Sequence, residues 1–178
     1  MSNRACAKPP QRPPDVKDGA DSFPPRFFEA EERIRRIAAG LITCTLPRAA
    51  WTHEAHVAAV VTLILEYPEI HLEQELPGII SRFNESVGGV NDDTQGYHET
   101  ITQYWIANAR AHLAANPDGG LLDRVNRFIA SPDGQRDAPL RHYSREKLFS
   151  VEARRHLVEP DLMRFEWASA NAAPASKL

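Results

Sequence analysis

The sequence predicts an all-α fold, a single-domain antiparallel bundle of about six helices behind a Pro-rich N-terminal segment. Apolar residues recur at helical spacing through residues 26–167, and the short alternating runs typical of β-strands are absent. Residues 55–65 are apolar on every side of a helix except at Thr62. Because a helix of this kind is buried at the centre of a fold, Leu63 and Ile64 are both expected to be core residues.

The first two helices have clear boundary residues. The first is expected over residues 27–39, and Gly40 is expected to end it, because glycine readily adopts the left-handed conformation found after helix C-termini. The second is expected to begin near Thr52, whose hydroxyl can cap the first turn, and to stop before Pro68.

Four further helices are expected along the rest of the chain. The third covers residues 69–87, where Pro77 either introduces a kink or opens a new first turn. The fourth covers residues 96–115 and the fifth covers residues 121–130. A single sixth helix is expected over residues 144–158.

The length of 178 residues suits one domain. Residues 1–25 hold six of the 14 prolines and are expected to form a disordered tail. Residues 26–167 are expected to form the helical domain, and residues 168–178 a flexible C-terminal tail.

Charge and composition exclude several kinds of partner. The formal net charge of −3 argues against a nucleic-acid partner held by phosphate contacts. No stretch approaches the roughly 20 apolar residues that span a membrane, so no membrane partner is expected. Two cysteines are too few for a disulfide scaffold or a Cys-ligated zinc site. A small-molecule substrate is the expected partner, and a homo-oligomer is left open.

The expected location is the cytoplasm, because the first residues lack the apolar region of a secretory signal. The last three residues, Ser176, Lys177 and Leu178, match a peroxisomal address, which has meaning only in a eukaryotic cell.

Three histidines stand at the starts of two expected helices. His53 and His56 are three residues apart, so their imidazoles share one helix face, and His98 opens the fourth helix. Neutral imidazole ligates Zn, Fe, Cu and Ni, so these histidines are expected to hold one divalent metal ion if the two helix ends meet. In the alternative interpretation, His53 lies in an exposed first turn and His56 is a core histidine bonded to a carbonyl group.

Glu54 and Glu99 each follow one of these histidines and are candidate catalytic residues. Either carboxylate could orient a ligating imidazole or act as a general base on a metal-bound water. Each is equally compatible with an acidic residue in a first turn, where the helix dipole favours negative charge.

Five residues are candidates for substrate binding. Trp51, Tyr97 and Trp105 could form an aromatic wall, although aromatic residues at helical spacing are typical of a core. Arg82 could hold a carboxylate or phosphate through paired hydrogen bonds, and Asn84 lies close to it in the sequence. A solvated helix face is the favoured explanation of Arg82.

Residues 136–155 carry a mild excess of basic side chains. Such an excess is typical of a solvated face, but it could also attract an anionic substrate.

The motifs W-x-H-x-x-H at residues 51–56 and Y-H-E-T-x-T at residues 97–102 resemble those of a family of small helical bacterial proteins of uncharacterised activity. The resemblance also takes in RFNES at residues 82–86 and the segment from Tyr143 to Leu162. It implies that these stretches occur together, and it implies no activity, cofactor or substrate.

The leading hypothesis is a metal-dependent enzyme with a mononuclear three-His site and an open coordination position. It would act on a small molecule by hydrolytic or hydration chemistry at Zn, or by oxidative chemistry at Fe or Cu. The alternative is a metal-free protein that binds a small molecule with the same polar cluster. A third interpretation is a helical interaction module whose histidines only cap and pack helices.

Overall fold

The computed structural model describes residues 26–165 and 167, and over this range the predicted all-α class is confirmed, with seven α-helices and no strand. The tails expected over residues 1–25 and 168–178 lie outside the described residues. The α-helices are α1 (Glu31–Ile42), α2 (His53–Glu66), α3 (Leu72–Ser86), α4 (Glu99–Ala115), α5 (Leu121–Ala130), α6 (Arg145–Leu148) and α7 (Val151–Arg155). The 3₁₀ turns are η1 (Arg48–Ala50), η2 (Pro132–Gly134) and η3 (Ala138–Arg141).

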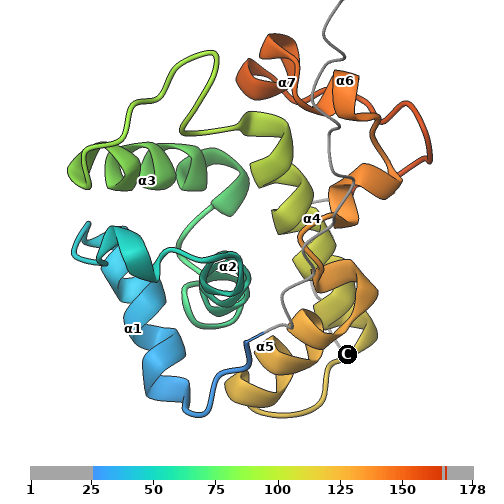
Figure 1. The fold of residues 1–178 in the computed structure, drawn as a ribbon. Coiled ribbons are helices and arrows are strands. Elements are labelled where there is room, and N and C mark those ends of the chain that lie inside the picture. The colour runs from blue at the N-terminus through green and yellow to red at the C-terminus, as the bar shows by residue number, and fades with distance from the viewer. Residues whose placement is uncertain (1–25, 166, 168–178) are drawn as a thin grey trace, which may run out of the picture.

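Helix α2 is the central helix, as its sequence predicts. Figure 1 shows it nearly end-on, and α1, α4 and α5 pack against it. Ala55 and every residue from Val57 to Leu63 are buried. Ile64, by contrast, is only half-buried, so the expectation that it lies in the core as fully as Leu63 is wrong.

The predicted start of α2 is confirmed, since the Thr52 hydroxyl accepts a hydrogen bond from the Ala55 N–H at 3.3 Å. The predicted end of the first helix is wrong, because α1 continues through Gly40 to Ile42. Gly40 packs closely against Leu46, since a Cβ there would make a tight contact of 3.1 Å with the Leu46 Cβ. The left-handed residue of this turn is Cys44, at φ 57°.

The boundaries of α5 match the prediction, whereas the expected sixth helix is two short helices. Ser144 caps α6 through the Lys147 N–H, and Ser150 caps α7 through the Ala153 N–H. A serine that caps a new helix must leave the preceding one, because its backbone is extended at φ −70° and ψ 156°. Pro77 lies inside α3 rather than at a new start.

Two clusters of buried apolar side chains hold the described residues together. The larger joins α1, α2, α3, α4 and α5. The smaller contains Tyr104 from α4 together with Tyr143, Leu148, Ala153 and Val158 from the part of the chain that follows α5, which we call the C-terminal segment. No helix among the described residues is long and apolar enough to cross a membrane.

Candidate ligand-binding pocket

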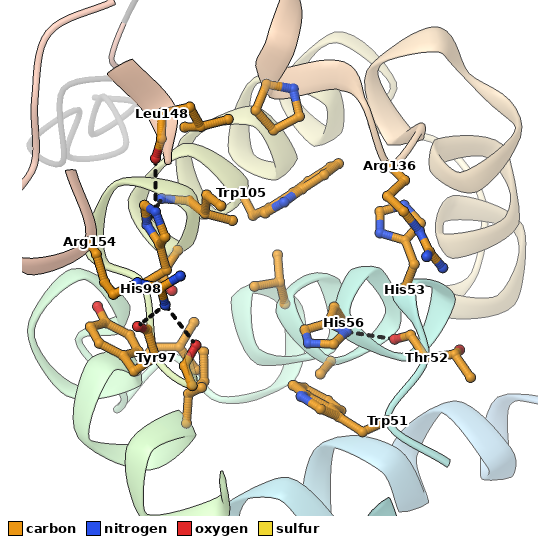
Figure 2. A pocket seen from close by; sticks show the side chains of 18 of the residues that line it. Trp51, Thr52, His53, His56, Tyr97, His98, Trp105, Arg136, Leu148 and Arg154 are labelled. Atoms are coloured by element: carbon orange, nitrogen blue, oxygen red, sulfur yellow. Dashed lines mark hydrogen bonds between the residues drawn. The ribbon is translucent and has the colours of Figure 1, made fainter. Parts of the chain in front are cut away.

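A cavity of about 620 Å³ lies where the central helix, α3, α4 and the C-terminal segment meet. Its volume falls in the range of about 300–1,000 Å³ that is usual for small-molecule sites. Figure 2 shows its polar and aromatic side chains. The lining residues are Leu41, Trp51, Thr52, His53, His56, Ala59, Val60, Leu76, Ile80, Gly96, Tyr97, His98, Ile101, Thr102, Trp105, Arg136, Pro139, Leu140, Leu148, Phe149 and Arg154. All three histidines singled out in the sequence therefore line one cavity.

His53 lies in the first turn of α2, half-buried rather than in an exposed first turn. Its Nε2 lies 2.7 Å from the carbonyl oxygen of Gly134. Since a carbonyl oxygen can only accept, Nε2 carries the hydrogen and Nδ1 keeps its lone pair. Burial lowers the pKa of His53, the Gly134 carbonyl raises it and the charge of Arg136 lowers it, with a net lowering. The imidazole is therefore neutral at pH 7.

His56 lies one turn further along α2. Its Nδ1 donates to the Thr52 carbonyl oxygen at 2.6 Å, so the free lone pair is on Nε2. The ring is accessible from the cavity, yet enough protein surrounds it to penalise the charged form, and this desolvation lowers its pKa to about 4. Trp51 covers one side of the ring, with ring centroids 3.8 Å apart.

His98 is the N-cap of α4 and not part of the helix, because α4 begins at Glu99 rather than at residue 96 as predicted. Its Nδ1 accepts the Ile101 N–H at 3.3 Å, and its Nε2 donates to the Leu148 carbonyl oxygen at 2.9 Å. Both ring nitrogens are therefore engaged by the backbone. Burial and the nearby charge of Arg154 lower the pKa of His98.

The three imidazoles share a cavity without forming a ready-made metal site. Among residues 26–165 and 167, no group of three or more His, Cys, Asp or Glu side chains is placed to hold a metal ion. Within the described part of the chain, both ring nitrogens of His98 are hydrogen-bonded, whereas His53 and His56 each keep one ring nitrogen without a partner.

The two candidate catalytic carboxylates do not line the cavity. Glu99 accepts a hydrogen bond from the Tyr97 hydroxyl at one carboxylate oxygen and from the Gln103 amide at the other. The Glu99 carboxylate therefore holds the Tyr97 ring in place. Burial, and to a smaller extent this hydrogen bond, raises the pKa of Tyr97. Glu54 is in the first turn of α2, beside His53 and outside the set of lining residues.

The five candidate substrate-binding residues divide into two groups. Trp51, Tyr97 and Trp105 line the cavity, and Trp105 packs against the His53 ring at 5.2 Å between centroids. Arg82 is exposed on α3 and Asn84 orders the following loop by donating to Asn91 Oδ1 and the Val90 carbonyl oxygen, so neither lines the cavity.

Two cavity residues, Arg136 and Arg154, are not singled out by the sequence. They come from opposite ends of the mildly basic segment 136–155, and that excess is the only sequence signal that pointed to them. Figure 2 shows Arg136 beside His53, and Arg154 with His98 and Tyr97 on the opposite side of the cavity.

The lowered pKa values of the three histidines predict a loss of stability at mildly acidic pH. Each histidine has a lower pKa in the folded protein than the value of about 6.5 expected in the unfolded chain. At a pH between these two values, the unfolded chain binds protons that the folded protein does not. The free energy of unfolding should therefore fall as the pH drops from about 7 to about 5, above the range where carboxylates protonate.

Urea titrations at both pH values measure this effect. His56→Gln should reduce the difference between the two free energies, whereas His71→Gln, at an exposed position that does not line the cavity, should preserve it. Equal stability of the unmodified protein at the two pH values would contradict the prediction.

Comparisons with protein-family models, with curated proteins and with solved structures each returned no match to this chain.

Proposed function

We propose that the protein binds a small organic molecule in this cavity without a metal ion, and that His53 and His56 accept hydrogen bonds from its hydroxyl or N–H groups. The observation that carries the proposal is the state of these two rings. Each donates its N–H to a backbone carbonyl and has, among the described residues, no partner for its other nitrogen. Both rings line a largely apolar cavity with Trp51 and Trp105 in its walls. A few polar groups in an apolar cavity are the usual composition of a ligand site.

A metal-dependent enzyme is the alternative. One feature favours this alternative: His53 and His56 each donate the ring N–H to a backbone carbonyl group. Histidines that ligate a metal through one ring nitrogen commonly donate the N–H of the other in this way. These two rings would supply two ligands, whereas catalytic zinc sites usually have about three protein ligands. Both ring nitrogens of His98 are hydrogen-bonded to the backbone. His98 would therefore have to lose one of these hydrogen bonds to serve as the third ligand.

Binding can be tested on untagged, metal-stripped protein with 3-phenylpropanamide, an uncharged probe that combines an aromatic body with N–H donors. Trp51 and Trp105 line the cavity, so their fluorescence should change in a saturable manner. His56→Leu should weaken binding about two- to tenfold, the equivalent of one lost hydrogen bond. His71→Leu should leave binding unchanged. No saturable binding to the unmodified protein would contradict the proposal.

The same preparation separates the two hypotheses. After reconstitution in turn with Zn, Fe, Cu and Ni, elemental analysis should find no stoichiometric metal, and 3-phenylpropanamide should bind the metal-free protein. One metal ion per chain that is lost in both His53→Ala and His56→Ala, but kept in His156→Ala, would overturn the metal-free proposal in favour of the enzyme.

A further inference from the structure

We infer that the natural ligand of this cavity is an organic anion, with an apolar body and one carboxylate or phosphate group held by the guanidinium of Arg154. This inference rests on the proposed function, because it requires that the cavity bind a small molecule.

The first support is the charge of the cavity wall. Among the described residues, no Asp or Glu lines the cavity, whereas Arg136 and Arg154 both do. The three histidines cannot be counted as further cations, since their lowered pKa values keep them neutral. The lining residues therefore carry a net positive charge, and a positively charged cleft attracts anions.

The second support is the state of Arg154 itself. The residue is half-buried, and its Nη1 donates to the carbonyl oxygens of Tyr97 at 3.0 Å and Gly96 at 3.4 Å. These contacts hold the guanidinium at the cavity wall and leave its other N–H groups without a protein acceptor among the described residues. Arginine presents its N–H groups in a planar fork that matches a carboxylate or phosphate.

The third support is a comparison with other arginines of the chain. Arg155, the next residue, forms a two-bond ion pair with Asp93 at 2.7 Å, and it does so on the exposed surface. Arg35, Arg110 and Arg141 are likewise paired with carboxylates. Arg154 is more enclosed than Arg155, yet within the described part of the chain it has no carboxylate partner. A half-buried cation without a counter-ion is costly, and a bound anion would remove that cost.

Glu99, which follows His98 in the chain, is already engaged by other side chains. Glu99 is held by Tyr97 on one oxygen and by Gln103 on the other, and it does not line the cavity. His98, next to Arg154, donates its ring N–H to the Leu148 carbonyl oxygen and carries no negative charge. The position beside Arg154 is thus open to an anion from outside, while the apolar body would lie toward Trp105 and Trp51.

The test compares probes that share one aromatic body. At low ionic strength, 3-phenylpropanoate or 3-phenylpropyl phosphate should bind the unmodified protein about tenfold more tightly than uncharged 3-phenylpropanamide, as expected for one charge-assisted contact. A preference for both anions, or for only one of them, supports the inference, and the latter also identifies the anionic group. The preference should shrink as salt is added.

Arg154→Gln should abolish the preference for the anions over the amide. Arg154→Lys should retain part of it, because the charge is kept and the fork is lost. Arg36→Gln changes the net charge equally at an exposed position outside the cavity, and should retain the full preference. If Arg154→Gln does not fold, Arg154→Lys decides instead, since a reduced preference supports the inference and a full preference overturns it.

The outcomes separate this inference from the proposed function. Equal binding of all three probes, or a preference that persists in Arg154→Gln, would overturn the inference and leave the binding pocket intact. Failure of every probe to bind would overturn both.

Discussion

Leu63→Ala is expected to lower the free energy of unfolding by about 2–5 kcal/mol, the usual cost of truncating a buried leucine. Leu63 is 1% exposed and lies in the stretch of α2 that α1, α4 and α5 surround. Because helices enclose it on several sides, the surrounding residues cannot close the cavity that the lost atoms leave.

Equilibrium urea unfolding measures this cost. Ile64→Ala is the matched comparison, since it removes the same number of carbon atoms from the next residue of the same helix. Ile64 is half-buried, so its truncation should cost clearly less than that of Leu63. A cost below about 1 kcal/mol at Leu63 would mean that α2 is not the centre of the fold.

Gly134→Ala should destabilise the protein by about 3 kcal/mol, toward the upper end of the range for overpacking, and disturb the pocket as well. A Cβ at this position would come 1.9 Å from the Phe128 carbonyl oxygen and 2.7 Å from its carbonyl carbon. Both are backbone atoms of α5, so no side chain can turn aside and η2 must move away from α5. Since the Gly134 carbonyl oxygen holds the Nε2 of His53, this movement should release the imidazole.

Urea unfolding and the NMR titration of the His53 ring protons report the two effects separately. Gly78→Ala is the control, because its Cβ would meet only the end of the Arg82 side chain, at 3.2 Å, and that exposed side chain can move. Alanine in place of glycine inside α3 should stabilise the protein by about 0.5–1 kcal/mol. Unchanged stability and an unchanged His53 titration in Gly134→Ala would show that η2 does not position the ring.

The all-α class and the central helix could be predicted because their signals are local. Residues 55–65 are apolar all round, and Thr52 caps the helix through a residue three positions away. The boundaries of α5, Leu121–Ala130, also follow from the local sequence. Where a boundary depends on contact with a distant or competing group, the prediction failed. Gly40 was expected to end the first helix, but its packing against Leu46 explains its presence.

The grouping of the site residues was partly predictable for the same reason. Helical spacing places His53 and His56 on one face, and the expectation that the start of α4 meets the start of α2 is supported by the cavity that all three histidines line. The aromatic residues Trp51, Tyr97 and Trp105 line it too. The metal ligation and the catalytic roles of Glu54 and Glu99 stay predictions.

By itself, the sequence determined the helical class, the buried central helix and the presence of three histidines at two helix starts, because helix periodicity and capping act within a few residues. Only the tertiary structure decided which ring nitrogens of His53 and His98 are engaged by distant carbonyl groups. The carbonyl oxygens that engage His53 and His98 belong to Gly134 and Leu148, 81 and 50 residues away in the chain. It likewise decided that Arg154 lines the cavity while Arg155 pairs with Asp93. Hydrogen bonds and charge interactions of this kind depend on distance in space, which sequence periodicity does not encode across loops.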